Sequence, residues 1–382
     1  MFIKNLIKRE DNLTLACMLT LLVFGLVMVY SASSVLALKW YGDPSYFLKR
    51  QAVWAALGVA AMLIVWNMDY RKLKYLSLPA LGVLFLLLIL VLAPGIGAEI
   101  NGSRRWVRLA GLSLQPSEFI KPALIVFIAA SLARRSDRLR DFVYGLGPYL
   151  ILTGIVVFLI ALEPDFGTAA ALCAVIFFML LFAGARFIHL FVIGLMSLPV
   201  LYYQLFCVGF RRGRLSVFLD PWSDPLGGGF QIIQSFLAFG GGGLTGLGLG
   251  QGRQKLLFLP EPHSDFIYSV IGEEFGLVGA ICVLALFAVI TYCGLRLALK
   301  CQDEFGRNLA FGLTLMIGIQ AIINMGVATG LLPNKGMPLP FISAGGSALF
   351  AALVSVGVLL SIARAERGPA PRVVRSQAVR RV

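Results

Sequence analysis

The residues best suited to chemistry lie in the stretch PEPHSDFIYSVIGEE, from Pro260 to Glu274. A proline-broken loop ends there, and an apolar segment begins directly after the carboxylate of Asp265. A carboxylate held where a polar loop meets an apolar segment can act as a general base toward a lipid-borne substrate. As an alternative, Ser264 or Asp265 caps the helix that starts at Phe266. That position would lower the pKa of Asp265 through the helix dipole and keep it ionised, as a base requires.

Small and acidic residues follow Asp265 at helical spacing. The small ones on its face are Ser269, Gly272, Gly276 and Gly279. Such residues predict a groove for close helix packing, for a partner helix or for a lipid chain. Glu273 and Glu274 lie two to three turns deeper, where an acid must be paired or protonated. We expect these two acids either to be structural or to belong to the same cavity as Asp265.

A basic loop, Asn101–Glu118, holds Arg104, Arg105 and Arg108 around Trp106. Guanidinium groups bind phosphate oxygens in pairs, and an indole ring stacks on sugars or lies at a membrane interface. The loop therefore predicts an anion-binding site. Attraction to anionic lipid headgroups is the alternative explanation.

The apolar segment after this loop begins with polar residues, Ser117, Glu118 and Lys121. A lysine inside a membrane helix is costly unless it is paired or faces a polar cavity, so Lys121 is a candidate site residue. Glu118 lies three residues earlier and can simply neutralise Lys121. The two explanations are compatible if both groups face one cavity.

Two further carboxylates, Glu163 and Asp165, flank Pro164 between two apolar segments. We expect them to pair with an arginine of the outer loops, or Asp165 to cap the following helix.

The longest loop, Val208–Ser264, is too large for a simple connector and too rich in glycine for an independent domain, which is typical of a functional loop. Eleven glycines lie between Gly227 and Gly252. Their backbone amides can approach an anion closely. The polar candidates in this loop are Arg211, Arg212, Arg214, Gln231 and Gln234. A divalent cation, Mg²⁺ or Mn²⁺, is possible at Asp220 or Asp224, although no spacing requires one.

The composition shows what must position these groups. Of 382 residues, 59% are hydrophobic and only 14% are charged, so apolar windows of about 20 residues recur along the chain. Strand alternation is not visible, and helices satisfy their own backbone in lipid. We therefore predict an all-α polytopic membrane protein with ten transmembrane helices. The predicted spans are residues 13–36, 51–66, 75–92, 117–133, 142–162, 167–183, 187–207, 266–297, 309–329 and 342–362.

Most lysines and arginines fall on one side of these spans, together with both termini. The positive-inside rule makes that side cytoplasmic and places the Val208–Ser264 loop outside, between helices seven and eight. We expect residues 1–366 to form one transmembrane domain with a retained first helix, and residues 367–382 to form a basic, disordered cytoplasmic tail.

The net charge of +14 does not require nucleic acid, because anionic lipid and topology explain basic juxtamembrane loops. Six cysteines are scattered without pairing or metal spacing, and the only histidines are His189 and His263. Disulfides and a zinc site are not expected.

Four motifs follow one another along the chain: NGSRRWVRLAGLSLQPSEFIKPA, DPW…GGFQIIQS…GGGLTGLGLG, LPEPHSDFIYSVIGEEFGLVGA and GLLPNKGMPLPFISAGGSAL. In this order they resemble the SEDS family, the FtsW and RodA proteins of bacterial cell-wall synthesis. Together they cover nearly the whole chain. Departures at Pro262, Ser264, Pro338 and Ala344 flank the matched positions. The stretch Asn334-Lys335-Gly336 is more similar to division-type FtsW than to elongation-type RodA.

The resemblance implies ten spans and an inverting glycosyltransferase that polymerises lipid II at the outer face of the cytoplasmic membrane. The important acid of the family matches Asp265. The matched binding residues are Arg104, Arg105, Trp106, Glu118 and Lys121, and the motifs add His263, Lys335 and Ser343. Implied partners are the lipid-linked nascent glycan, a class B penicillin-binding protein and other cell-division proteins.

Two other functions compete with this one. A lipid flippase would favour polar residues along a through-path and repeat symmetry between halves, whereas here the polar groups gather on one side. A non-catalytic scaffold for cell-wall enzymes would make Asp265 dispensable.

Overall fold

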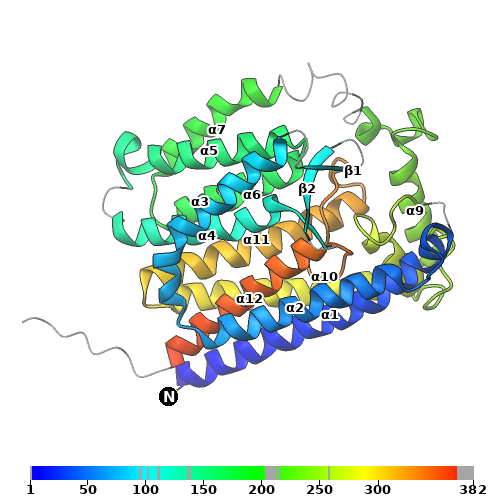
Figure 1. Ribbon diagram of the computed structural model, residues 1–382, viewed down its shortest axis with the longest axis horizontal. Helices are drawn as coiled ribbons and strands as arrows, with labels where there is room; N and C mark the ends of the chain where they lie inside the picture. The colour runs from blue at the N-terminus through cyan, green and yellow to red at the C-terminus, as the bar shows by residue number, and fades with distance from the viewer. Residues whose placement is uncertain are drawn as a thin grey trace, which may run out of the picture.

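A computed structural model describes residues 2–93, 97–100, 103–109, 112–135, 139–202, 213, 216–256 and 259–367. Its long helices run side by side as one bundle (Figure 1). Eight helices in the described part of the chain are long and apolar enough to cross a membrane. They are α1 (Phe2–Tyr41), α2 (Tyr46–Asn67), α3 (Leu73–Leu92), α4 (Pro116–Arg135), α5 (Gly147–Leu162) with the π-helical turn Phe142–Leu146, α10 (Ile267–Lys300), α11 (Glu304–Ala328) and α12 (Gly346–Arg367). The prediction of a multi-helix membrane protein is confirmed.

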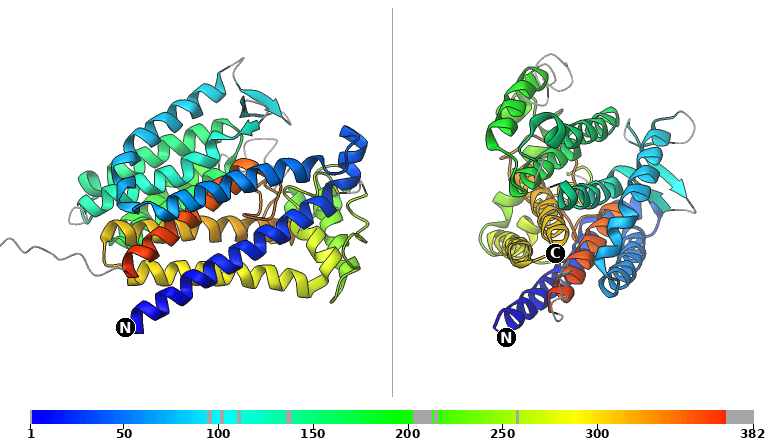
Figure 2. Two further views of the ribbon diagram at one scale, coloured as in Figure 1. Left: turned by 60° about the horizontal axis from the view of Figure 1, so that its bottom comes forward. Right: turned by 90° about the vertical axis from the view of Figure 1, so that its left-hand side faces the viewer.

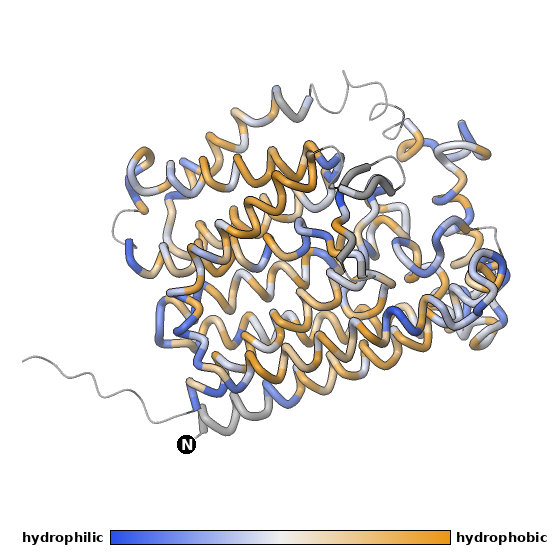
Figure 3. Tube along the Cα trace, viewed as in Figure 1, coloured by the Kyte–Doolittle hydropathy of each residue, from blue (hydrophilic) through white to orange (hydrophobic). Residues whose placement is uncertain are grey.

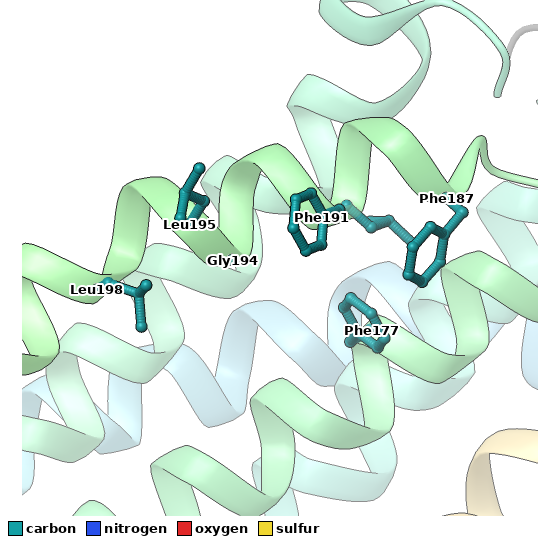
Figure 4. Close-up of a pocket in the computed structure, with 7 residues that line it drawn as sticks. Phe177, Phe187, Phe191, Gly194, Leu195 and Leu198 are labelled. Atoms are coloured by element: carbon teal, nitrogen blue, oxygen red, sulfur yellow. The ribbon is translucent and has the colours of Figure 1, made fainter.

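Two shorter apolar helices, α6 (Phe166–Phe182) and α7 (Phe187–Tyr202), fall on the remaining two predicted spans. An apolar cavity of about 260 Å³ separates them, lined by Phe177 of α6 and by α7 side chains that include Phe187 and Phe191 (Figure 4). Because apolar side chains line it, this cavity is suited to hydrocarbon rather than to a charged substrate.

The centre of the bundle is formed by α11 and α12, which have the largest buried shares of the spans. α12 packs against α2, and α11 packs against α10 and α4. Hydrophobic residues follow the middle of the helices, and hydrophilic residues gather toward their ends (Figure 3). The beginning of α1 and the end of α12 lie at the same end of the bundle (Figure 2). An ion pair between Asp11 and Arg367 joins them there.

The other end of the bundle carries a small sheet and an extra helix, both missed by the sequence analysis (Figure 1). The strands β1 (Ala98–Ile100), β2 (Ser103–Leu109) and β3 (Leu112–Leu114) pair antiparallel in the order β1-β2-β3. The expectation that the chain contains helices alone is therefore wrong in the loop between α3 and α4. Backbone amides and oxygens there are satisfied by pairing between the strands.

The loop after α7 contains helix α9 (Phe230–Gly242) and a 3-10 turn at Pro221–Ser223. The glycines concealed this helix in the sequence. The sequence FQIIQSFLAF nevertheless places Ile232, Ser235 and Ala238 on one buried face at helical spacing. α9 packs with this face against α10, so the loop is a structured element rather than a simple connection.

Candidate functional site

Asp265 lies half-buried in the loop just before α10. Its backbone oxygen accepts a hydrogen bond from Nδ2 of Asn324 in α11, at 2.8 Å. The same amide donates to the oxygen of Met337 at 2.7 Å. Asn324 thus ties the loop before α10 to the loop before α12. These two bonds fix the backbone of Asp265 without using its carboxylate oxygens.

The expectation that Ser264 or Asp265 caps the helix is wrong. Phe266 occupies the N-cap position, and no described side chain caps α10. Ser264 Oγ instead donates to Asp265 Oδ1 at 3.2 Å. Burial, and to a smaller extent the Glu261 carboxylate, raise the pKa of Asp265 to about 6. The predicted lowering of this pKa is therefore also wrong, because loss of hydration outweighs any favourable helix-dipole effect.

The segment 339–344 supports the Asp265 loop from the α12 side. Ser343 Oγ donates to the backbone oxygen of Ser264 at 2.6 Å and accepts from the Leu339 amide at 2.8 Å. The Ala344 amide donates to the oxygen of His263 at 2.9 Å. Ser343, predicted to contact substrate, is buried and is used to hold the loop.

His263 was also predicted to contact the substrate, and its ring lies 4.2 Å from that of Phe47 in α2, centroid to centroid. Burial lowers its pKa to about 4, so the imidazole is neutral at pH 7. A neutral ring supplies no positive charge to a diphosphate. The ring contact with Phe47 packs the Asp265 loop against α2.

Arg105 in β2 binds the turn between α5 and α6. Its Nε donates to the oxygen of Glu163 at 2.6 Å, and its Nη2 donates to the oxygen of Pro164 at 3.2 Å. Its Nη1 lies 3.7 Å from Asp165 Oδ2. Asp165 also caps α6, accepting from the Thr168 amide at 3.1 Å. Both alternatives given for Asp165, capping and an arginine partner, are therefore correct.

We expect Arg105→Ala to destabilise the protein by about 1–3 kcal/mol, because it leaves two backbone oxygens without their donor and removes the cation beside the Asp165 carboxylate. Arg105→Lys should not restore the stability, since a single ammonium cannot serve all three acceptors. Thermal denaturation in detergent measures both effects. Arg50→Ala is the matched control, because the hydrogen bonds of Arg50 are longer, 3.3 Å to Ser113 and 3.4 Å to Tyr46. Equal melting temperatures for the Arg105 and Arg50 variants would contradict this assignment.

Glu163 is fully buried within the same turn, and neither carboxylate oxygen has a hydrogen-bond partner among the described residues. Burial raises its pKa to about 8. Glu163 is therefore mostly protonated at pH 7 and adds little negative charge beside Asp165.

Lys121 and Glu118 form an ion pair of 2.8 Å one turn inside α4, and their side chains are only 2% and 5% exposed. The neutralising pair predicted from the sequence is present. A lysine inside the bundle requires such a partner, so the pair is a polar element within α4.

Of the remaining predicted residues, those that the structure describes lie in β2, in α9 and in the loop before α12. Arg104 and Arg108 lie in β2, opposite Glu99 and Ser113, on the same strand as the half-buried Trp106. Gln231 in α9 accepts a hydrogen bond from Asn334 Nδ2 at 2.6 Å, and Gln234 is half-buried one turn further along. Lys335 follows Asn334, and the next residue, Gly336, lies against the carboxylate of Asp265. Arg211, Arg212 and Arg214 lie outside the described residues, as does the tail 368–382.

The two aspartates proposed for a metal bind their own loop. Asp220 Oδ1 accepts from the Trp222 amide at 3.1 Å, and Asp224 Oδ2 accepts from the Gly228 amide at 2.8 Å. Across the described ranges, no group of three or more His, Cys, Asp or Glu side chains could hold a metal ion. These residues do not form a preformed metal site.

The glycine groove predicted along α10 is filled by the chain itself. A Cβ added at Gly272 would lie 2.3 Å from the ring of Phe239 in α9. Glu273 accepts from the backbone amide of Arg253 at 2.7 Å, and Glu274 pairs with Lys255 at 2.7 Å. Of the two explanations given for these acids, the structural one is supported.

Sequence analysis did not find Asn324 or Lys255. Asn324 was detectable as a polar residue inside the apolar run AIINMGVA, where a polar group must have a partner. Lys255 carried no signal of its own because it lies in a polar loop, where lysine is common.

Comparison with known proteins gives three kinds of match. The model of a cell cycle protein family that comprises FtsW, RodA and SpoVE matches residues 11–368. A probable peptidoglycan glycosyltransferase FtsW of Geobacter metallireducens is 48% identical, over 95% of this chain and 96% of that protein. Stage V sporulation protein E of Bacillus subtilis is 43% identical, over 94% of this chain and 98% of that protein.

Solved structures are also similar. One chain of a peptidoglycan synthase complex, described as coordinating polymerization and crosslinking, has a TM-score of 0.72 and 34% identity, covering 90% of this chain and 97% of that chain. The rod shape determining protein RodA of Thermus thermophilus has a TM-score of 0.67 and 30% identity, covering 92% and 95%.

Proposed function

Because this chain belongs to the cell cycle protein family of FtsW, RodA and SpoVE, we infer that it is a peptidoglycan glycosyltransferase. It polymerises lipid II into glycan strands and serves cell division, as its identity to proteins named FtsW indicates. The observation that carries the inference is the placement of Asp265. The residue is half-buried, its backbone oxygen is held by Asn324, and the loop before α12 holds the backbone oxygen of the preceding Ser264.

In the membrane we propose ten spans, formed by the eight long helices with α6 and α7, and both termini in the cytoplasm. The beginning of α1 and the end of α12 lie at the same end of the bundle (Figure 2), and the positive-inside rule is our reason for making that side cytoplasmic. The sheet, α9 and Asp265 then face outward, which places the reaction at the outer face of the inner membrane. The large loop between the seventh and eighth spans, which contains α9, is extracytoplasmic in this arrangement.

We propose that Asp265 accepts the proton of the acceptor sugar hydroxyl as that oxygen attacks the anomeric carbon of the lipid-linked donor. The bond from that carbon to the diphosphate breaks, and the diphosphate leaves with the electron pair. A single displacement inverts the anomeric centre and requires no covalent enzyme intermediate. Positive charge near the diphosphate lowers the barrier, and Arg104, Arg108, Arg211, Arg212 and Lys121 are the proposed sources.

We propose that a divalent cation, Mg²⁺ or Mn²⁺, if it takes part, is bound by the diphosphate of the substrate. Because the described carboxylates do not form a preformed site, we derive no step through such an ion. The proposed macromolecular partners are a class B penicillin-binding protein and other division proteins at the division site, and the second lipid substrate is the lipid-linked nascent glycan. The similarity to a chain of a peptidoglycan synthase complex supports the first of them.

The pKa of Asp265, about 6, predicts how the rate depends on pH. A base works only when ionised, so polymerisation should be half-maximal near pH 6 and about tenfold slower at pH 5 than at pH 7. Ser264→Ala removes the hydrogen bond that lowers this pKa, so the midpoint should move to higher pH. Initial rates of glycan synthesis between pH 5 and 8 measure both. A midpoint that is the same in both proteins would exclude Asp265 as the titrating group.

The function itself is tested with purified protein and its class B penicillin-binding partner, supplied with lipid II in detergent. Formation of glycan polymer is the expected result. Absence of polymer, together with movement of lipid II across vesicle membranes, would favour the alternative of a flippase. Polymer made only by the partner, at the same rate without this chain, would favour a scaffold.

A further inference from the structure

Helix α10, which begins directly after the Asp265 loop, is interrupted at Gly276. Gly276 has φ 65° and ψ −164°, which is not helical, and it divides α10 into an outer part, Ile267–Phe275, and an inner part that continues to Lys300. A broken helix leaves backbone amides and oxygens unpaired, which is costly inside a membrane bundle. Something else must satisfy these groups.

The glycine-rich segment after α9, residues 243–248, enters the break and satisfies them. The amides of Leu277 and Val278 donate to the oxygens of Gly243 and Leu244, at 2.9 and 3.1 Å. The amides of Leu247 and Gly248 donate to the oxygens of Glu273 and Glu274, at 3.0 and 2.9 Å. The segment therefore bonds to both parts of α10. Because the break removes direct helical bonds, the position of the outer part depends on this segment.

A buried ion pair lies directly beside the break. Lys255 Nζ is 2.7 Å from Glu274 Oε1, and the two side chains are 6% and 0% exposed. Lys255 also donates to Ser31 Oγ of α1 at 3.0 Å, and Ser31 donates to Glu274 at 2.7 Å. Glu274 belongs to the outer part of α10, and Lys255 lies in the loop that follows the glycine-rich segment. The pair therefore connects the inserted segment to the outer part of α10 and to α1.

Stability alone does not explain this ion pair, since a buried ion pair often stabilises a protein no more than apolar residues of similar size would. It does fix one register, because any slip of the segment would separate two desolvated charges. The acid next to Glu274 adds to this selection, because the Glu273 carboxylate accepts from the Arg253 and Gln254 amides. Residues 253–255 are therefore held by two adjacent carboxylates, those of Glu273 and Glu274.

We propose that Lys255 is a positioning residue for the transfer reaction. By pairing with Glu274 it holds the glycine-rich segment in the break of α10, and this sets the outer part of the helix and Asp265. The catalytic part of this proposal rests on the proposed function, whereas the structural part does not. Lys255 acts through the backbone of α10 and does not touch the reacting atoms.

The test compares Lys255→Met with Lys300→Met in the full chain with its penicillin-binding partner. Lys300 is the matched control because it also pairs with a glutamate, Glu10 of α1, at 2.8 Å, and lies at the opposite end of α10 from Glu274. Lys255→Met should lower kcat at least tenfold and change KM for lipid II less than twofold. Lys300→Met should keep the parent kcat.

Hydrogen exchange provides a readout that is independent of activity. In Lys255→Met, amides of residues 244–248 and 277–278 should exchange at least tenfold faster than in the parent, and in Lys300→Met they should not. Glu274→Gln is the second variant, for use if Lys255→Met does not fold, and the same changes are expected from it.

Faster exchange with an unchanged kcat would overturn the proposal, since the pair would then be structural only. A loss of activity that appears only as a higher KM would also overturn it and make Lys255 a substrate contact. Unchanged exchange would refute the structural part directly. If the parent protein makes no polymer, the proposed function fails, and the exchange data still decide whether Lys255 holds the segment.

Discussion

Replacing Asp265 by asparagine is expected to reduce glycan polymerisation by about 10²–10⁴-fold, the usual contribution of a general base. Asparagine keeps the size and shape of the side chain and cannot accept the proton. The backbone bonds that hold this position, from Asn324 to Asp265 and from Ser343 to Ser264, do not involve the carboxylate. The variant should therefore fold and melt like the parent, or at a higher temperature.

The higher temperature has a physical reason. Burial raises the pKa of Asp265, so the ionised form is disfavoured in the folded protein. A raised carboxyl pKa lowers the stability of the folded state above the unfolded pKa, and a neutral amide avoids this cost. Loss of activity with unchanged or increased stability is the signature of a residue kept for chemistry.

Asp43→Asn is the matched control, because Asp43 lies in a different loop, between α1 and α2, and pairs with the exposed Lys49. Exposed pairs contribute little to stability, so this variant should keep parental activity and melting temperature. Full activity of Asp265→Asn would remove the basis for the proposed mechanism. A parallel loss in the Asp43 variant would show that the assay reports outer-loop charge instead of catalysis.

The spans were predictable from the sequence because lipid imposes a local pattern. About 20 apolar residues are needed for each crossing, and the composition of the segment itself reveals them. The sheet and α9 lie outside that constraint, in a region where short polar segments and glycines carry weak signals. Helix α9 is stabilised by its packing against α10. This is a tertiary contact, which the local sequence pattern does not predict.

The candidate site was predictable by residue type more than by role. Asp265, Lys121 and Glu118 were found because charge is rare in or beside apolar segments. Arg105 was predicted to bind phosphate, but a guanidinium fork suits carbonyl oxygens as well, and here it binds the turn before α6. The pKa of Asp265 was predicted in the wrong direction because its burial arises from loops distant in sequence.

The largest effect on folding is expected at Gly246, in the segment that enters the break of α10. Gly246 has φ +83°, and a Cβ there would lie 2.2 Å from the backbone oxygen of Glu274. Backbone atoms on the other side of the contact cannot rotate away, so Gly246→Ala must displace the segment or distort the helix. We expect a loss of at least about 3 kcal/mol in the free energy of unfolding, combining overpacking with backbone strain.

Gly250→Ala separates these two causes. Gly250 has nearly the same φ, +81°, and no heavy atom lies within 4 Å of its added Cβ. This variant therefore carries the cost of a left-handed alanine alone, about 1 kcal/mol. Unfolding in detergent, followed by heat or denaturant, should place the Gly246 variant well below the Gly250 variant. Similar losses would mean that backbone conformation, and not the close approach to Glu274, accounts for the glycine. A larger loss at Gly246 requires the segment to be seated in the break, because only there does its backbone meet that of α10.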